Sequence, residues 1–134
     1  MKTRKLGQNG PQVSAIGLGA MSFGGIFGDT TEAESLRCLD AMLDCGINFI
    51  DTANIYGMGL SETVLGAWLK TRSPQVTIAT KASFVPGPPR RIDNSESHLR
   101  AELDASLRRL GRDHVELFYI HRREHARPLA EVIG

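Results

Sequence analysis

The sequence is short of the residues that mark several specialised classes of protein. Its 134 residues include only two cysteines, too few for the framework of a disulfide-stapled secreted domain. No apolar run reaches the roughly 18 residues that a membrane-spanning helix needs. The formal net charge is +1, and the arginine pairs are scattered without interleaved aromatic residues. We therefore expect neither nucleic acid nor a membrane as a partner.

The N-terminal residues and the cysteines indicate an intracellular protein. Residues 1–12 contain basic side chains but no apolar segment follows them, so they lack the pattern of an export signal and we expect a cytoplasmic location. On one helix, Cys38 and Cys45 would have α-carbons about 10 Å apart, too far for a disulfide. We expect two buried thiols in a reducing compartment. With 41% hydrophobic and 23% charged residues, residues 1–134 are expected to form one globular unit without a metal site.

Apolar runs and turn residues predict an alternation of strands and helices. Asn9-Gly10 is typical of a tight hairpin turn. The flanking runs 2–6 and 13–18 are expected to form the hairpin, with the second run continuing into the first core strand. Further strands are expected at 48–51, 76–81 and 115–121.

Helices are expected between these strands, each with recognisable signals at its ends. The signals are Thr31 with Glu34 and then Gly46 for the first helix, Ser61 and Pro74 for the second, Asp93 with Glu96 and then Gly111 for the third, and Leu129 for the start of a fourth. A loop rich in proline and glycine is expected at 86–89.

This alternation favours a parallel α/β sheet, because parallel neighbours need a crossover connection. The order alone fits both an open doubly wound sheet and an arc of a (β/α)8 barrel. The glycine-rich segment 17–24 does not indicate a dinucleotide-binding fold. Ser22 stands where the GxGxxG spacing requires a glycine, and the segment does not open directly into a helix. We interpret it as a strand-to-loop turn that needs small residues.

Polar side chains follow three successive strands of the expected sheet. Asp51 ends the second core strand and Tyr56 follows five residues later, while Lys81 ends the third strand and His121 the fourth. The carboxyl ends of parallel strands lie at one edge, where such folds place their chemistry. Each residue alone has a structural interpretation, as a cap, a loop aromatic, a solvent-facing charge or a core histidine. Together they form a candidate catalytic site.

These four residue types suit the reduction of a carbonyl group. Hydride addition leaves an alkoxide, which needs a proton donor and stabilisation of its charge. Tyr56 can donate the proton, because a nearby ammonium such as that of Lys81 favours the phenolate that remains. Asp51 would pair with Lys81 and fix its position, and His121 would donate a hydrogen bond to the carbonyl oxygen.

Four segments of the chain resemble the aldo-keto reductase family. The run GINFIDTANIYG at 46–57, followed by SETVLG at 61–66, is similar to the family signature around its catalytic Asp and Tyr. IATK at 78–81 and LFYIHR at 117–122 are similar to the segments that carry its catalytic Lys and His. The loop after Tyr56 and the pair His121-Arg122 are most similar to the bacterial and potassium-channel β-subunit-like branch.

The resemblance implies a (β/α)8 TIM barrel, closed at its base by a hairpin, that reduces small aldehydes and ketones with NADPH. The implied catalytic residues are Asp51, Tyr56, Lys81 and His121. The implied cofactor-binding residues are Gly19, Ala20, Met21 and Asp51. Ala20 departs from the Thr often present in the family, so a hydroxyl hydrogen bond would be lost.

The chain is also shorter than the barrel that the resemblance implies. Such barrels need roughly 250 residues, whereas this chain supplies a hairpin and about four β/α units, the last incomplete. We expect the N-terminal half of the barrel, without the loops that hold most of the NADPH, and doubtful activity for this chain alone. Two alternatives stay open: a nucleotide-sensing or regulatory subunit on the same fold, and a half-barrel that self-associates through open sheet edges.

Overall fold

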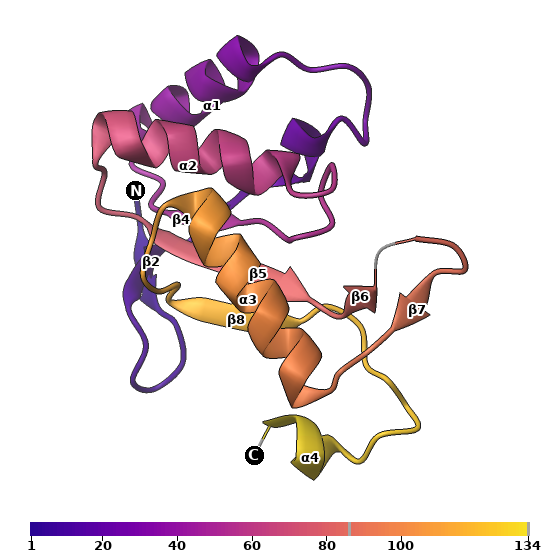
Figure 1. The fold of residues 1–134 in the computed structure, drawn as a ribbon. Helices are drawn as coiled ribbons and strands as arrows, with labels where there is room; N and C mark the ends of the chain where they lie inside the picture. Colours follow the sequence, from indigo (N-terminus) through magenta and orange to yellow (C-terminus); the bar gives the residue numbers. More distant parts are fainter. Residues whose placement is uncertain (86, 134) are drawn as a thin grey trace.

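Four parallel strands form the centre of the computed structural model, which describes residues 1–85 and 87–133 (Figure 1). They are β3 (Leu18–Gly19), β4 (Phe49–Asp51), β5 (Thr77–Ala82) and β8 (Leu117–Ile120), hydrogen-bonded in that order. All three pairings are parallel, so the expected order of the core strands is confirmed. Ile50 and Ile78 are register partners at the middle of the sheet, and both side chains are fully buried.

A separate antiparallel hairpin of β1 (Thr3–Lys5) and β2 (Gln12–Ser14) precedes the sheet. The hairpin expected around Asn9-Gly10 is confirmed, but its connection spans the whole of 6–11 instead of a tight turn. The N–H of Leu6 donates to the carbonyl of Pro11 at 2.9 Å. Pro11 has no N–H to return, so the ladder stops there and the turn widens.

The first core strand is shorter than the expected 13–18. The hydroxyl of Ser14 donates to the carbonyl of Ile16 at 2.6 Å, and the N–H of Ser14 donates to Asn48 Oδ1 at 2.6 Å. These bonds satisfy groups that a continuous strand would use in its ladder, and Ile16 is exposed. The sheet strand therefore begins only at Leu18, which packs against the core.

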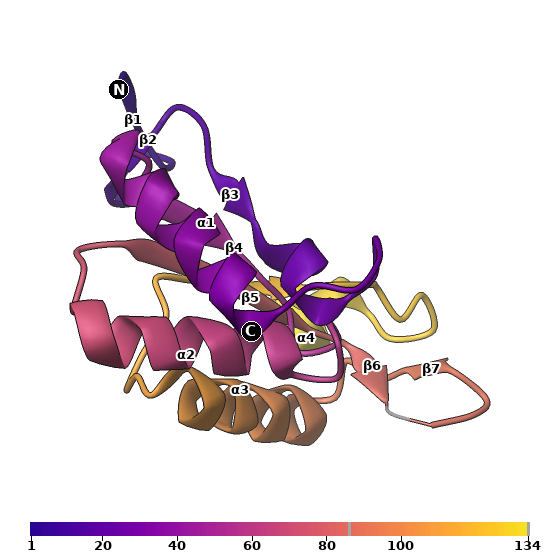
Figure 2. The same ribbon diagram turned by 90° about the horizontal axis from the view of Figure 1, so that it is seen from above.

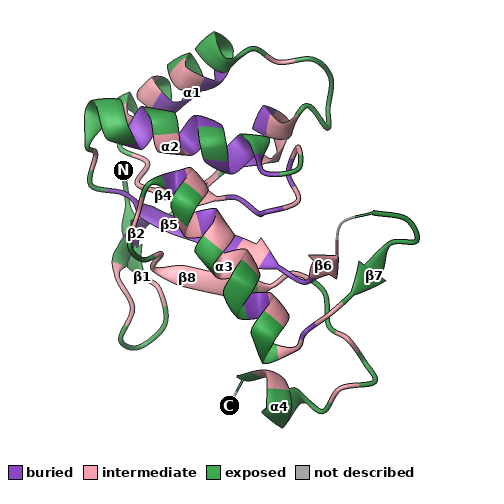
Figure 3. Ribbon diagram, in the orientation of Figure 1, coloured by how far each residue is buried: buried purple, intermediate pink, exposed green. Residues whose placement is uncertain are grey.

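Three helices cover one side of the sheet: α1 (Glu32–Asp44), α2 (Leu60–Arg72) and α3 (Glu96–Leu110) (Figure 2). Their apolar sides and the sheet enclose a core that includes Leu39, Met42, Leu65, Trp68 and Leu110. Figure 3 shows β5 mostly buried at the centre, whereas the edge strand β8 is mostly half-buried. The fourth helix, α4 (Leu129–Ile133), starts where expected and has no buried residue in the part described.

The helix α1 starts as expected but does not bury its cysteines. The Thr31 hydroxyl accepts from the N–H of Glu34 at 3.2 Å, and the Glu34 carboxylate accepts from the N–H of Thr31 at 2.8 Å, which confirms the capping box. Cys38 and Cys45 are exposed, so the expectation of buried thiols is wrong. Cys38 is rotated about 100° around the helix from its buried neighbour Leu39, and Cys45 lies at the C-cap.

The expected caps of the next two helices are wrong. Gly59, with φ 93°, is the N-cap of α2, and Ser61 lies inside the helix, where its hydroxyl contacts other parts of the chain. Ser95 rather than Asp93 caps α3. Asp93 instead accepts a hydrogen bond from the N–H of Ser95 at 2.7 Å, which holds the pKa of Asp93 below its usual value. Local side-chain bonds of this kind compete with the capping geometry that sequence spacing suggests.

A buried ion pair joins α2 to α3 and was not anticipated. Glu62 of α2 is fully buried, and its carboxylate accepts from Arg109 of α3 at 2.7 Å and from the hydroxyl of Thr80 on β5 at 2.5 Å. Gly66 lets the helices approach, since a Cβ there would lie 2.1 Å from the carbonyl oxygen of Arg109. The glycine is therefore required by helix packing, and the close approach brings Arg109 to Glu62.

The loops at the carboxyl edge of the sheet contain short regular elements. A 3-10 helix, η1 (Ala20–Gly24), follows β3, and a small hairpin of β6 (Phe84–Val85) and β7 (Arg91–Ile92) follows β5. The loop expected at 86–89 connects β6 to β7, although Pro86 itself lies outside the described residues. Figure 1 shows this hairpin projecting from the sheet beyond β5.

Candidate active site

The four expected catalytic side chains come together at the carboxyl edge of the sheet. Asp51 is the last residue of β4, Lys81 lies near the end of β5, and His121 directly follows β8. Side chains alternate between the two faces of a strand. Ile50 packs in the helix-covered core and Thr80 hydrogen-bonds to α2. Asp51 and Lys81 therefore point to the opposite face, away from the helices.

Lys81 is the centre of the arrangement. Its ammonium forms an ion pair with Asp51 and donates to the carbonyl of Thr52 at 2.8 Å and to the hydroxyl of Tyr56 at 3.1 Å. These contacts use all three N–H donors of the group. The Lys81 side chain is 13% exposed, so its charge is only weakly screened by solvent. The expected proximity of Lys81, Asp51 and Tyr56 is confirmed.

The loop after β4 holds Tyr56 in place. Its N–H donates to the carbonyl of Ala53 at 3.1 Å, and its carbonyl accepts from the N–H of Ser61 at 3.2 Å. Gly24 lies directly against this turn, since a Cβ there would be 2.6 Å from the carbonyl carbon of Tyr56 and 2.4 Å from the nitrogen of Gly57. Backbone therefore packs on backbone, and the turn that carries Tyr56 has little room to move.

His121 faces the same space as Tyr56. Its ring makes edge contacts with the rings of Tyr56 and Phe84, with centroids 5.8 and 5.3 Å apart. Partial burial is the main cause that lowers the pKa of His121 below its ordinary value, with the positive charges of Lys81 and Arg122 adding to it. The imidazole is therefore neutral at pH 7 and presents one N–H donor.

Two further side chains support the site and were missed from the sequence. Ser61 donates to the carbonyl of Ala20 at 2.8 Å and shares a hydrogen bond of 2.9 Å with the hydroxyl of Thr52, whose carbonyl binds Lys81. This ties β4 to α2 and η1. The available signal was the spacing of Ser61 from Val64 and Leu65, which places its hydroxyl on the buried stripe of the helix.

The geometry and the comparisons with known proteins agree. The profile of the Aldo/keto reductase family matches residues 15–134. The chain belongs to the aldo/keto reductase family. It is 38% identical to the uncharacterized oxidoreductase YrpG of Bacillus subtilis and 32% identical to the aldo-keto reductase yakc of Schizosaccharomyces pombe, whose name includes NADP(+), over 98% of this chain in both cases.

Solved structures show the same relationship. The holo form of the aldo-keto reductase AKR11C1 from Bacillus halodurans is 34% identical and matches 99% of this chain with a TM-score of 0.88. The chain spans 43% of YrpG, 40% of yakc and 44% of AKR11C1. The expected family is confirmed, and the parallel sheet with its covering helices is part of an aldo/keto reductase (β/α)8 barrel.

In this aldo/keto reductase chain, the residues expected to contact a cofactor differ in their exposure to solvent. Gly19 is exposed beside its register partner Asp51, and a Cβ there would meet no atom within 4 Å. Met21 is partly exposed. Ala20 is fully buried and its carbonyl accepts from Ser61, so its methyl group does not face the site. A space of about 380 Å³ lined by Gly19, Asp51 and Phe49, among others, opens beside them. Gly19 and Asp51 are therefore accessible from this space, Met21 does not line it, and Ala20 is buried.

The described residues contain neither a candidate metal cluster nor a candidate membrane-spanning helix. In residues 1–85 and 87–133, no group of three or more His, Cys, Asp or Glu side chains is placed to hold a metal ion. Over the same residues, no helix has the length and apolar character needed to cross a membrane.

Proposed function

We propose that this chain supplies the proton-transfer site for the NADPH-dependent reduction of small aldehydes and ketones to alcohols. The observation that supports this most directly is the ammonium of Lys81, held by Asp51 and placed 3.1 Å from the hydroxyl of Tyr56. The NADP(+) in the name of yakc and the holo form of AKR11C1 support a nicotinamide cofactor.

The proposed proton transfer uses Tyr56 as the acid. A reduced nicotinamide, when bound, supplies the hydride. The substrate oxygen would lie against the hydroxyl of Tyr56, which gives up its proton as negative charge develops on that oxygen. The phenolate that remains is stabilised by the nearby Lys81 ammonium, and Asp51 holds this ammonium in position.

His121 is proposed to orient the carbonyl. Its neutral ring faces Tyr56 edge to face and can direct an N–H toward the same oxygen. A donor placed where charge develops contributes roughly 100- to 1,000-fold to the rate in other enzymes. The residues proposed to hold the nicotinamide end of the cofactor are Gly19, Met21 and Asp51, whereas the fully buried Ala20 is not accessible to it.

The test follows NADPH oxidation with a small aromatic aldehyde in a complete barrel that contains this segment. Tyr56→Phe removes the acid and should lower kcat by about 100- to 10,000-fold while leaving NADPH binding unchanged. Tyr119→Phe is the matched control, since Tyr119 is the other tyrosine of the chain and lies in register with Lys81 on β8. Full turnover in Tyr56→Phe would refute the proposal. Tight NADPH binding without turnover of any aldehyde or ketone would favour the nucleotide-sensing alternative.

A further inference from the structure

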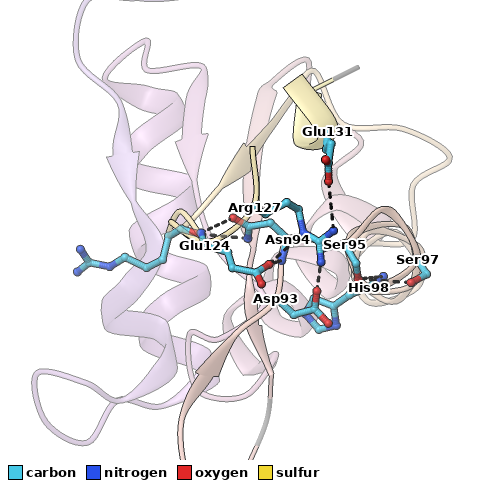
Figure 4. A network of polar contacts seen from close by, with 9 residues as sticks. Asp93, Asn94, Ser95, Ser97, His98, Glu124, Arg127 and Glu131 are labelled. Atoms are coloured by element: carbon cyan, nitrogen blue, oxygen red, sulfur yellow. Dashed lines mark hydrogen bonds and ion pairs between the residues drawn. The ribbon is translucent and has the colours of Figure 1, made fainter. Parts of the chain in front are cut away.

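A reciprocal hydrogen-bonded clamp holds the segment that follows His121 (Figure 4). Asn94 is fully buried just before α3. Its side-chain N–H donates to the carbonyl of Arg122 at 3.1 Å, and its side-chain oxygen accepts from the N–H of Glu124 at 2.7 Å. The carboxylate of Glu124 accepts in return from the backbone N–H of Asn94 at 3.0 Å. One amide side chain thus pairs with the backbone as a neighbouring strand would.

The same segment is held from its other side by the end of β5. The N–H of His121 donates to the carbonyl of Ala82 at 3.0 Å, and the N–H of Arg122 donates to the hydroxyl of Ser83 at 2.9 Å. The carbonyl of the fully buried Ser83 also accepts from the N–H of Asp93 at 2.8 Å, next to Asn94. The backbone after His121 is therefore fixed between two buried residues, Ser83 and Asn94.

His121 depends on this backbone because its ring lacks another anchor. A functional histidine is commonly oriented by a hydrogen bond at the ring nitrogen that does not act on the substrate. Here Nδ1 is buried and has no hydrogen-bond partner among the described residues. The ring is held by its edge contacts with Tyr56 and Phe84 and by the position of its own α-carbon. A displacement of that backbone would carry the ring away from Tyr56.

We propose that Asn94 is a positioning residue for His121, acting through the backbone of residues 122–124 to hold the imidazole against Tyr56. A role of this positioning in catalysis rests on the proposed function, whereas the effect of Asn94 on the position of the His121 ring does not. Loss of the Asn94 amide displaces the His121 ring, whether or not the ring then acts on a substrate.

The test compares variants of the 134-residue chain by nitrogen–proton NMR spectra of the histidine rings and by ring-to-ring proton contacts. Asn94→Ala should remove the contacts between the rings of His121 and Tyr56. His121 should then titrate at a higher pH, closer to an ordinary histidine, because burial and the charges of Lys81 and Arg122 lower its pKa in the native arrangement, with Asp51 opposing them. The backbone N–H of Glu124 should exchange with solvent up to about ten times faster, because a native hydrogen bond is lost.

Asn48→Ala is the matched control. Asn48 makes the same kind of clamp at the other end of the sheet, accepting from the N–H of Ser14 at 2.6 Å and donating to the carbonyl of Gln12 at 3.3 Å. It should leave the spectrum of His121 unchanged, which separates positioning from a general loss of stability. If His121 keeps its contacts and titration in Asn94→Ala, the inference is overturned.

A second pair of variants approaches the clamp from its exposed side, for the case in which Asn94→Ala does not fold. Glu124→Ala removes the acceptor for the N–H of Asn94 and should loosen His121 in the same direction. Glu124→Gln retains an acceptor and should preserve the native spectrum, so this conservative change acts as the rescue. Equal spectra in Glu124→Ala and Glu124→Gln would also overturn the inference. None of these readouts needs turnover, so a barrel without reductase activity would refute the proposed function and leave this result standing.

Discussion

Replacement of Arg109 by Met should destabilise the fold far more than its place near the surface suggests. Glu62 is fully buried, and Arg109 supplies its ionic partner at 2.7 Å. Methionine keeps much of the apolar stem but leaves the carboxylate of Glu62 with the hydroxyl of Thr80. Removing one partner of a buried pair costs about 3–5 kcal/mol. We take the lower end, about 3 kcal/mol, because Arg109 is 28% exposed and water can replace part of its interaction.

Urea unfolding followed by circular dichroism measures this effect. A urea m-value of about 2 kcal/mol/M is typical of a small domain, so a loss of about 3 kcal/mol lowers the unfolding midpoint by about 1.5 M. All variants are compared at one protein concentration, because self-association would add to apparent stability.

Two further variants identify the buried charge as the cause. Arg72→Met breaks the ion pair between Arg72 and Asp40, whose side chains are 55% and 38% exposed, and should shift the midpoint much less because exposed pairs contribute little. The double variant Glu62→Gln with Arg109→Met removes the unpaired charge and should recover much of the loss. If Arg109→Met costs no more than Arg72→Met, the assignment of a structural role to the Glu62 pair is wrong.

Four other outcomes are expected from the same structure. Gly66→Ala should lower the free energy of unfolding by about 1–3 kcal/mol through overpacking, because its Cβ would lie 2.1 Å from the carbonyl oxygen of Arg109. Gly19→Ala should leave the urea midpoint unchanged, because its Cβ would meet nothing within 4 Å. The same Gly19→Ala change should weaken NADPH binding in a complete barrel. The lowered pKa of His121 contributes stability that is present above about pH 6.5, the ordinary pKa of a histidine in the unfolded chain. This stability is lost as the pH falls toward the lower pKa of His121 in the folded state. Urea midpoints between pH 5 and 8 should therefore depend less on pH in His121→Gln. The 134-residue chain alone should self-associate and turn over NADPH poorly, because the outer edges of β3 and β8 have no strand partner in the part described. A monomer in analytical ultracentrifugation, together with ordinary reductase turnover, would contradict this prediction.

Features set by local periodicity could be predicted from the sequence. The parallel order of the core strands and the capping box of Thr31 with Glu34 depend on apolar spacing and on residues three positions apart. The places where prediction failed depend on partners distant along the chain. Ser61 has the sequence features of a cap, but its hydroxyl bonds to the carbonyl of Ala20, 41 positions away. Cys38 was expected to be buried but is exposed. On a helix, a small rotation of the predicted apolar face is enough to exchange buried and exposed positions.

The candidate site divides in the same way. Asp51, Lys81 and His121 were identifiable because each ends a predicted strand within a distinctive motif, with Tyr56 five residues after Asp51, and the structure brings the four together. Asn94 carried no comparable signal, because its two side-chain bonds reach the backbone of Arg122 and Glu124, about 30 positions later. Sequence spacing contains no information on which backbone groups a buried amide will meet.

The two sides of β5 connect the stability of the helix layer to the geometry of the site. Thr80 faces the helices and donates to the buried Glu62, and Lys81, the next residue, therefore faces Asp51 and Tyr56. A slip of β5 by one residue would turn Lys81 into the apolar core and Thr80 into the site. The ion pair of Glu62 with Arg109 holds the carboxylate that Thr80 binds. The buried charge behind the strand thus opposes the slip that would remove the ammonium from beside the phenol.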